Sequence, residues 1–196
     1  MLILHNAHHD GKKPGTAIAA VFGVGLIGYH LVQNLCQRRY SIVHSLPFSW
    51  HSSSHRKKEN SDILDCIRKL IKNPAHVNRI DFVWSAGKGG FGMSQDDTQA
   101  ELDVFSEVLE MSMTVCREHP SCQVRFHMIS SAGGLFEGQR NVNAHSQPAP
   151  KRPYAFLKLA QEKILDDGNG LVRLIYRPTS VYGFAGLHRR MGLIPT

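Results

Sequence analysis

The sequence predicts an α/β fold, in which a doubly wound, mostly parallel sheet carries helices on both faces. Short apolar runs alternate with longer segments whose apolar residues recur at helical spacing, and this alternation is typical of a parallel sheet covered by helices. The first apolar run ends in a glycine-rich turn, Gly23-x-Gly25-x-x-Gly28, and a helical segment follows it. The length of 196 residues suits one domain with a substantial core.

The apolar runs predict five strands. The first ends in glycines, the second is stopped by Pro47, and the last is broken by Pro178. We expect these strands at residues 16–22, 41–46, 80–85, 123–129 and 171–176. Helices are expected after Gly28, from about residue 61 to residue 71, and over residues 94–117 and 154–165.

The remaining segments are expected to be irregular. Residues 1–15 are polar and end in Lys12-Lys13-Pro14-Gly15, so we expect a mobile N-terminal arm there and one domain over residues 16–196. Residues 48–59 and 138–152 are expected to form polar loops. Between Leu46 and Ile80 we find one helix and no convincing third strand, so this edge of the sheet is expected to be short or irregular.

The composition limits the classes of partner. The formal net charge of +7 suits a polyanionic ligand, either a nucleic acid or a dinucleotide. Basic residues are dispersed apart from Arg56-Lys57-Lys58, and no RNA-binding fingerprint or aromatic-basic stripe occurs, so no nucleic-acid partner is expected. No apolar run approaches the roughly 20 residues of a membrane span, and residues 1–5 lack the features of a secretory signal. We therefore expect a cytoplasmic protein without a membrane partner.

Neither the cysteines nor the histidines predict a metal or a disulfide. Cys36, Cys66, Cys116 and Cys122 lack C-x-x-C spacing, so free thiols are expected. The 12 histidines include pairs at residues 8–9 and at residues 51 and 55, but neither pair has the acidic or cysteine partners of a metal site.

The glycine-rich turn predicts a Rossmann-type dinucleotide site. Gly23 permits the tight turn, Gly25 lets the backbone approach a pyrophosphate, and Gly28 permits close packing of helix against strand. The pyrophosphate would lie at the helix N-terminus beside Ile27. The alternative is a tight turn that binds no ligand.

The end of the second strand bears on the choice of cofactor. An acidic residue about 20 positions after the turn would bind the ribose hydroxyls of NAD, but residues 29–58 contain no Asp or Glu. Ser45 lies at the expected position, and the following loop offers basic groups that suit a 2′-phosphate, namely His51, His55, Arg56, Lys57 and Lys58. This favours NADP over NAD, although Arg56-Lys57-Lys58 is also what a solvated charge run would look like.

A candidate catalytic group follows on a later helix. Tyr154 and Lys158 are four residues apart, which puts the phenol and the ammonium on one helix face. An ammonium there is expected to lower the pKa of the phenol and so make it a usable proton donor and acceptor. With Ser131 upstream and the glycine-rich turn before it, the pair points to a nicotinamide-dependent oxidoreductase. The alternatives are a structural cap for Ser131, a half-buried helix-start position for Tyr154 and a solvated Lys158.

Together these segments resemble the extended short-chain dehydrogenases/reductases, in the NAD(P)-dependent epimerase/dehydratase family that acts on nucleotide sugars. The resemblance runs from about residue 17 to residue 195 and includes Ala86-Gly87. It also includes Met128-Ile-Ser-Ser-Ala-Gly-Gly134, Pro153-Tyr-Ala-Phe-Leu-Lys158 and Leu174-Ile-Tyr-Arg-Pro-Thr-Ser-Val-Tyr-Gly183.

The resemblance implies roles for residues at matching positions. Ser131 matches the catalytic serine, Tyr154 the acid/base, and Lys158 the lysine that also binds the nicotinamide ribose. Pro178 and Ser180 match positions near the nicotinamide amide, and Ala86-Gly87 matches the loop beneath the adenosine. The implied chemistry is hydride transfer between the nicotinamide and a nucleotide sugar or other small carbonyl substrate. Family members commonly form homodimers through the helices expected here over residues 94–117 and 154–165.

The sequence also departs from the family. Phe22 occupies the first glycine position of the usual turn. The asparagine that is usual in the helix after Ala86-Gly87 is not recognisable, and this chain has Glu101-Leu-Asp-Val there. The family continues for roughly another hundred residues, so residues 16–196 are expected to be an NAD(P)-binding domain with the substrate lobe largely absent. The leading hypothesis is an epimerase, dehydratase or reductase that uses Ser131, Tyr154 and Lys158. The alternative is a cofactor-binding regulatory or scaffold module without turnover.

Overall fold

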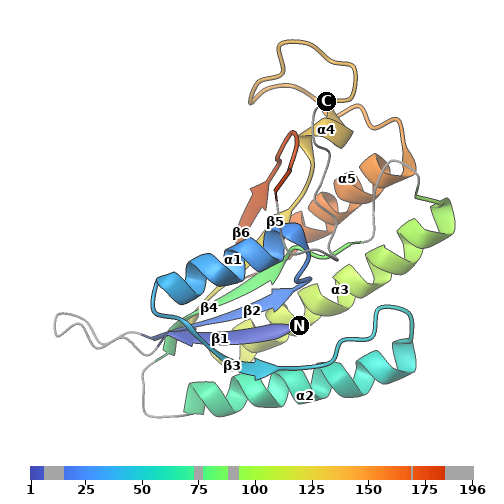
Figure 1. Cartoon of the computed structure of the whole chain (residues 1–196). Coiled ribbons are helices and arrows are strands. Elements are labelled where there is room, and N and C mark those ends of the chain that lie inside the picture. The colour runs from blue at the N-terminus through green and yellow to red at the C-terminus, as the bar shows by residue number, and fades with distance from the viewer. Residues whose placement is uncertain (7–15, 73–76, 88–92, 169, 184–196) are drawn as a thin grey trace.

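A six-stranded sheet forms the centre of the chain (Figure 1). The computed structural model describes residues 1–6, 16–72, 77–87, 93–168 and 170–183. The strand order is β3-β1-β2-β4-β5-β6. The strands are β1 (Leu2–Asn6), β2 (Thr16–Phe22), β3 (Ser41–Ser45), β4 (Val77–Trp84), β5 (Gln123–Ile129) and β6 (Val172–Tyr176). All five predicted strands are therefore confirmed, with small differences at their ends.

Strands β2, β4, β5 and β6 are parallel neighbours. Phe22 at the end of β2 pairs with Trp84 at the end of β4, and Trp84 pairs in turn with Met128 of β5. Because the carboxyl ends of parallel strands meet at one edge, the turns after β2, β4, β5 and β6 converge there. This edge holds most of the residues expected to act in binding or catalysis.

The N-terminal segment differs from the expected mobile arm. Residues 2–6 form β1, which pairs antiparallel with both β2 and β3 and so lies between them. Ile3 and Leu4 are fully buried, one on each face of the sheet, and this burial explains why the short apolar run Met1-Leu-Ile-Leu4 joins the core. Residues 7–15, the rest of the expected arm, lie outside the described residues. In a doubly wound sheet β3 would be the direct neighbour of β2, and here β1 takes that place.

Helices cover both faces of the sheet, as predicted. Helix α1 (Leu26–Gln37) packs Val32 against one face, where Ala19 and Val21 point. The opposite face carries α2 (Ser53–Lys72), α3 (Gln95–Glu118) and α5 (Pro153–Asp166). The short α4 (Ala132–Leu135) follows β5 (Figure 1). None of the helices in the described part of the chain has the length and apolar composition needed to cross a membrane.

Helix α2 begins much earlier than the sequence indicates. The predicted loop over residues 48–59 is wrong in its second half, because α2 begins at Ser53. Arg56 accounts for this, since its buried guanidinium ties the first turns of α2 to α3. The region between α2 and β4 contains no strand among the residues that the structure describes, and residues 73–76 lie outside them.

Candidate cofactor and catalytic site

The glycine-rich turn connects β2 to α1 and is tied to the end of β4. Gly23 has a φ of +88°, and a Cβ there would lie 2.4 Å from the Cα of Ala86. The Ser85 hydroxyl donates hydrogen bonds to the carbonyl oxygens of Gly23 (2.7 Å) and Phe22 (3.2 Å). At Gly28 a Cβ would lie 1.9 Å from the Gly23 carbonyl oxygen. Two of the three glycines are therefore required by backbone contacts.

Gly25 differs from its two neighbours. A Cβ there would meet no heavy atom within 4 Å, so packing alone does not require a glycine. Gly25 is the N-cap residue of α1 and carries no side chain that could accept hydrogen bonds from the first-turn N–H groups. No acidic residue lies in that first turn. A helix N-terminus of this kind suits the phosphate groups of a ligand.

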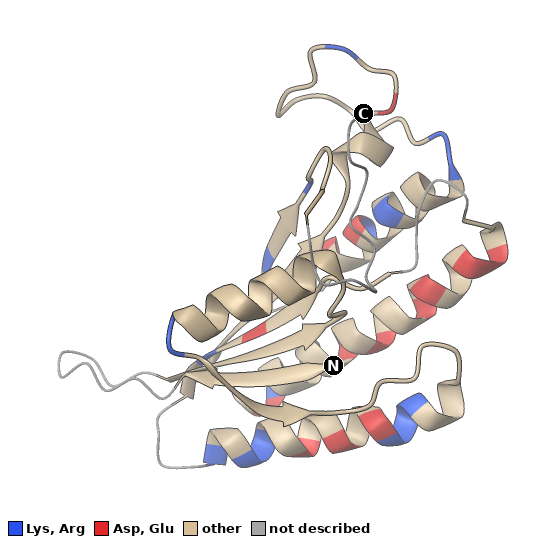
Figure 2. Cartoon of the chain, in the orientation of Figure 1, with Lys and Arg blue, Asp and Glu red and all other residues tan. Residues whose placement is uncertain are grey.

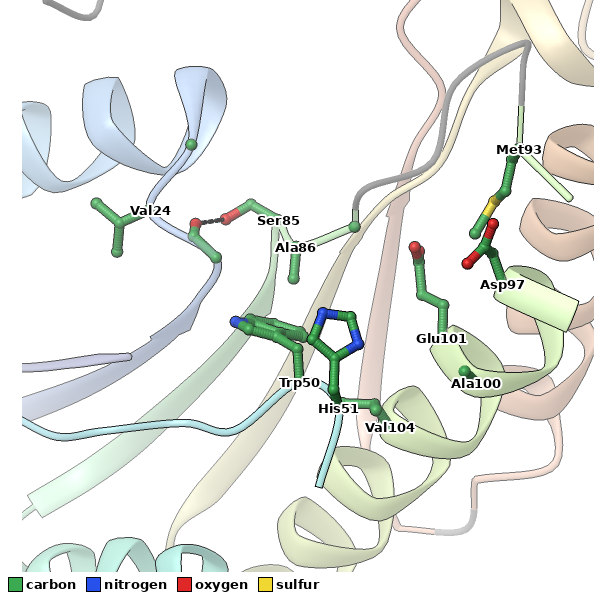
Figure 3. A pocket seen from close by; sticks show the side chains of 13 residues that line it. Val24, Trp50, His51, Ser85, Ala86, Met93, Asp97, Ala100, Glu101 and Val104 are labelled. Carbon is green, nitrogen blue, oxygen red and sulfur yellow. Dashed lines mark hydrogen bonds between the residues drawn. The ribbon is translucent and has the colours of Figure 1, made fainter. Parts of the chain in front are cut away.

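A cavity of about 300 Å³ opens beside this turn (Figure 3). Trp50 and His51 approach it from the segment between β3 and α2, and Asp97 and Glu101 approach it from α3. The remaining lining comes from the turns after β2 and β4 and from α3, namely Gly23, Val24, Gly25, Ser85, Ala86, Gly87, Met93, Ala100 and Val104. This concave, largely apolar site with a few polar groups has the general character of a small-molecule pocket.

An aromatic chain holds Trp50 in place. Phe48 packs edge-on against Phe22 with ring centroids 5.2 Å apart, and against Trp50 at 4.8 Å. Trp50 in turn packs edge-on against the buried Trp84 at 5.9 Å. This sequence of ring contacts anchors the segment after β3 to the core and presents Trp50 to the cavity.

Arg56 does not lie free for a 2′-phosphate, which corrects the expectation from the sequence. Its guanidinium forms two hydrogen bonds with the carboxylate of Glu107 on α3, at 3.0 and 2.9 Å. It also donates to the carbonyl oxygens of Ser49 and Trp50, both at 3.2 Å. Helix α3 is rich in acidic residues along its length, which makes it a suitable partner for this arginine (Figure 2). Arg56 therefore supports the Trp50 segment, while Lys57 and Lys58 remain exposed.

Ser45 is also displaced from its expected place. It is exposed on β3, and β1 separates it from the glycine-rich turn. Leu2 of β1 pairs with Ser45 on one side and with Val21 on the other. The pocket is instead reached by Trp50 and His51, further along the chain.

The candidate serine and tyrosine come together at the start of α4. Ser131 is the N-cap residue of α4, and its hydroxyl accepts a hydrogen bond from the Gly134 amide at 3.1 Å. A Cβ at Gly134 would lie 3.4 Å from both the Ser131 hydroxyl oxygen and the Tyr154 ring. Burial raises the pKa of the Tyr154 phenol; a hydrogen bond with Ser131 opposes this rise, and the charge of Glu101 adds to it. The expected lowering of this pKa by Lys158 is therefore wrong, and the phenol is protonated at neutral pH.

Lys158 lies in a buried polar cluster. Its side chain is 5% exposed, and its ammonium donates a hydrogen bond to the Gln161 side-chain oxygen at 3.0 Å. The Glu101 Oε1 lies 3.8 Å from Lys158 Nζ and accepts from the Gln161 amide at 3.4 Å. Burial lowers the pKa of the Lys158 ammonium, and the nearby carboxylate of Glu101 opposes this. The alternative of a solvated Lys158 is thereby excluded. Since Glu101 also lines the cavity, it connects Lys158 to the pocket.

The segment after β6 lies beside the start of α4. The Pro178 carbonyl accepts a hydrogen bond from the Ala132 amide at 2.9 Å. Arg177 forms a two-pronged ion pair with the buried Glu162 of α5, which also accepts a hydrogen bond from Ser130. Pro178 therefore lies beside Ser131, whereas Ser180 is exposed.

The sequence identified about a third of the cavity lining, with His51 included. Gly23, Gly25, Ala86 and Gly87 were expected and do line the cavity, and Ile27 and Gly28 follow in α1. The acidic residues of α3 and the aromatic segment after β3 were missed. Asp97 and Glu101 are four residues apart on a predicted helix, so the sequence could predict that they share a helix face. It could not predict that this face lies opposite the glycine-rich turn. Residues 88–92 and 184–196, most of which the resemblance from residue 17 to residue 195 also includes, lie outside the described residues.

The parallel sheet, the glycine turn at its carboxyl edge and the adjoining cavity define a Rossmann-type nucleotide-binding fold. The family model described as the NAD dependent epimerase/dehydratase family matches residues 19–196, and the chain belongs to this family. No curated protein matches the chain significantly.

Solved structures of nucleotide-sugar enzymes share the fold. The dTDP-4-dehydrorhamnose reductase of Bacillus anthracis, in complex with NADP, is 18% identical with a TM-score of 0.62, over 91% of this chain and 58% of that one. The UDP-glucose 4-epimerase of Thermus thermophilus, in complex with NAD, is 20% identical with a TM-score of 0.58, over 84% of this chain and 55% of that one. The UDP-N-acetylglucosamine 4-epimerase of Bacillus cereus is 16% identical with a TM-score of 0.59, over 89% of this chain and 58% of that one. The matched region is thus little more than half the length of each of these structures.

Proposed function

We propose that this chain binds NADP or NAD in the cavity beside the glycine-rich turn and catalyses an epimerase, dehydratase or reductase reaction on a nucleotide sugar. The observation that carries the proposal is the continuity of the cavity with the candidate catalytic groups. Glu101 lines the cavity and lies 3.8 Å from Lys158 Nζ, and Lys158 is one helical turn from Tyr154.

The residues present fit a dinucleotide. The Gly25 backbone faces open space at the start of α1, where the N–H groups of the first turn would bind the pyrophosphate. Trp50 offers an aromatic face beside the turn, and Ala86 and Gly87 offer a surface without bulky side chains. The preference for NADP now depends on His51, His55 and the exposed Lys57 and Lys58, because Arg56 is engaged with Glu107.

In this proposal each catalytic side chain has one task. The bound nicotinamide supplies or accepts a hydride. In the reductive direction Tyr154, which is protonated at neutral pH, donates its proton to the substrate oxygen and becomes a phenolate. In the oxidative direction the phenolate form of Tyr154 accepts the proton of the substrate hydroxyl. Ser131 donates a hydrogen bond to the same oxygen, and Lys158 binds the ribose hydroxyls while keeping a positive charge near the phenol.

Substitution of Tyr154 tests the proposed chemistry. Tyr154→Phe removes the proton donor but keeps the ring that packs against Gly134. We expect turnover to fall by about 100-fold or more, with the melting temperature and the affinity for NADPH close to those of the wild type. Full activity in Tyr154→Phe with any nucleotide sugar that the wild type converts would refute the assignment.

A cofactor-binding regulatory or scaffold module is the second candidate. One observation favours it, namely the engagement of Lys158 by Gln161 and Glu101. This candidate predicts saturable cofactor binding without hydride transfer to any nucleotide sugar. A homodimer through α3 and α5 remains a prediction from the family.

A further inference from the structure

Glu101 is a buried acidic residue at the wall of the proposed cofactor site. It lies in the second turn of α3, and its side chain is 7% exposed. Gly87 at the end of the β4 turn has a φ of +137°, and a Cβ there would lie only 2.6 Å from Glu101 Oε1 and 3.0 Å from Oε2. The β4 turn therefore approaches the carboxylate so closely that a side chain at position 87 would displace it.

The same carboxylate is the acidic group nearest to Lys158. Glu101 Oε1 lies 3.8 Å from the ammonium, and the fully buried Gln161 links the two, accepting from Lys158 and donating to Glu101. These three side chains form a closed polar cluster between α3 and α5. We call it the Glu101–Gln161–Lys158 cluster.

The other groups that face Lys158 do not replace this carboxylate. Glu162 of α5 is also acidic, but its oxygens are engaged by Arg177 and by Ser130. Tyr154, also on α5, presents its ring at 5.8 Å from Lys158 Nζ and stays neutral, and Gln161 carries no charge. Among the described residues, Glu101 is therefore the only carboxylate within 4 Å of the ammonium.

A buried ammonium needs a counterion. Removal of a charged group from water costs several kcal/mol, and an uncompensated lysine in such a place loses its proton instead. A neutral Lys158 could neither attract the ribose oxygens by charge nor stabilise a developing phenolate at Tyr154. The charge state of Lys158 therefore determines whether the proposed site works.

We propose that Glu101 is the counterion of Lys158 and holds it in its ammonium form at the wall of the dinucleotide cavity beside Gly87. Glu101 is thus a positioning residue that acts through Lys158. The inference rests on the proposed function for its catalytic consequence. It implies that Glu101 determines the highest pH at which Lys158 is charged and the site is competent.

The titration of Lys158 tests this inference without a cofactor. Protein labelled with ¹³C and ¹⁵N in its lysine side chains is titrated by NMR, and the Lys158 signal is assigned from its loss in Lys158→Arg. We expect Glu101→Gln to lower the titration midpoint of Lys158 by about one pH unit or more, a tenfold loss of proton affinity. Glu110→Gln is the matched control, because Glu110 lies on the exposed face of α3 and pairs with Arg117. An unchanged midpoint in Glu101→Gln would overturn the inference.

If Glu101→Gln alone does not fold, a second pair of variants tests the inference. Lys158→Met leaves the Glu101 carboxylate buried without its partner, whereas the double variant Glu101→Gln/Lys158→Met leaves two neutral side chains. We expect the double variant to melt at a higher temperature than Lys158→Met alone. A double variant that melts lower than Lys158→Met would contradict the counterion role.

The failure of this inference is distinguishable from the failure of the proposed function. A shifted Lys158 midpoint in a protein that binds neither NADPH nor NADH would support the Glu101–Lys158 pair and reject the cofactor site. An unchanged midpoint in a protein that binds NADPH would reject the pair and retain the site. In the wild type, binding of NADPH should weaken at high pH, and in Glu101→Gln this loss should begin at a lower pH.

Discussion

Gly25 and Gly28 lie three residues apart in the same turn, yet the structure predicts that alanine at Gly28 lowers the stability whereas alanine at Gly25 lowers only the affinity for the cofactor. A Cβ at Gly28 would lie 1.9 Å from the Gly23 carbonyl oxygen and 2.7 Å from the Ser85 hydroxyl oxygen, so the backbone has to move. Overpacking of this kind costs about 3 kcal/mol at the upper end of the usual range. For a chain of this length that corresponds to a melting temperature roughly 6–12 °C lower.

Gly25→Ala has room for its methyl group, because no heavy atom lies within 4 Å of the added Cβ and the φ of −80° suits any residue. We expect its melting temperature to stay within about 2 °C of the wild type. The methyl group would nevertheless occupy the surface that a pyrophosphate approaches. The affinity for NADPH should therefore fall by about tenfold or more, which is about 1.4 kcal/mol or more of binding free energy.

Thermal unfolding and titration with NADPH, both carried out on the two variants, separate these effects. Equal loss of stability in Gly25→Ala and Gly28→Ala would refute the packing argument. Unchanged NADPH affinity in a stable Gly25→Ala protein would show that the Gly25 backbone does not face the cofactor.

Two charged residues outside the catalytic group give further predictions. Although burial opposes it, hydrogen bonds from His127 and Arg125, together with the charges of Arg79 and Arg125, lower the pKa of Asp81 from 3.8 to about 2. The stability that Asp81 contributes is therefore present above pH 4 and is lost as the pH falls towards 2. Between these pH values the free energy of unfolding in urea should fall by about 2 kcal/mol less in Asp81→Asn than in the wild type. An equal fall in both proteins would contradict this. Arg56→Met removes the bonds to Glu107 and to the Trp50 segment, so it should weaken NADPH and NADH equally. A selective loss of NADPH affinity would instead assign Arg56 to the 2′-phosphate.

The sequence predicted the parallel part of the fold because its signals are local. The apolar runs of β2 and β5 and the glycine turn can be read within a few residues, and the structure begins and ends these strands as predicted. The early start of α2 could not be read, because it depends on the long-range contact of Arg56 with Glu107, 51 residues away. The insertion of β1 is a similar case, since a five-residue segment with only three apolar residues becomes a strand only when two neighbouring strands supply hydrogen bonds.

The candidate site, like the fold, could be predicted from the sequence only in part. Motif spacing identified Ser131 and Tyr154, and the structure brings them together around Gly134. The pKa shifts of Tyr154 and Lys158 could not be foreseen, because burial dominates both and burial is a property of the packed structure. The contact between Glu101 and Lys158 joins two helices that are distant in sequence, so helical spacing alone cannot reveal it.

Titration of the wild-type protein with NADPH and with NADH, followed by nicotinamide fluorescence, tests the central claim most directly. We predict saturable binding of at least one of the two, with NADPH the tighter ligand, and weaker binding in the stable Gly25→Ala variant. The ratio of the two affinities also measures how strongly the basic groups His51, His55, Lys57 and Lys58 together favour the 2′-phosphate. Absence of a saturable fluorescence change with either nucleotide would contradict the assignment of the cavity as a dinucleotide site, and the catalytic roles of Tyr154 and Lys158 would fall with it.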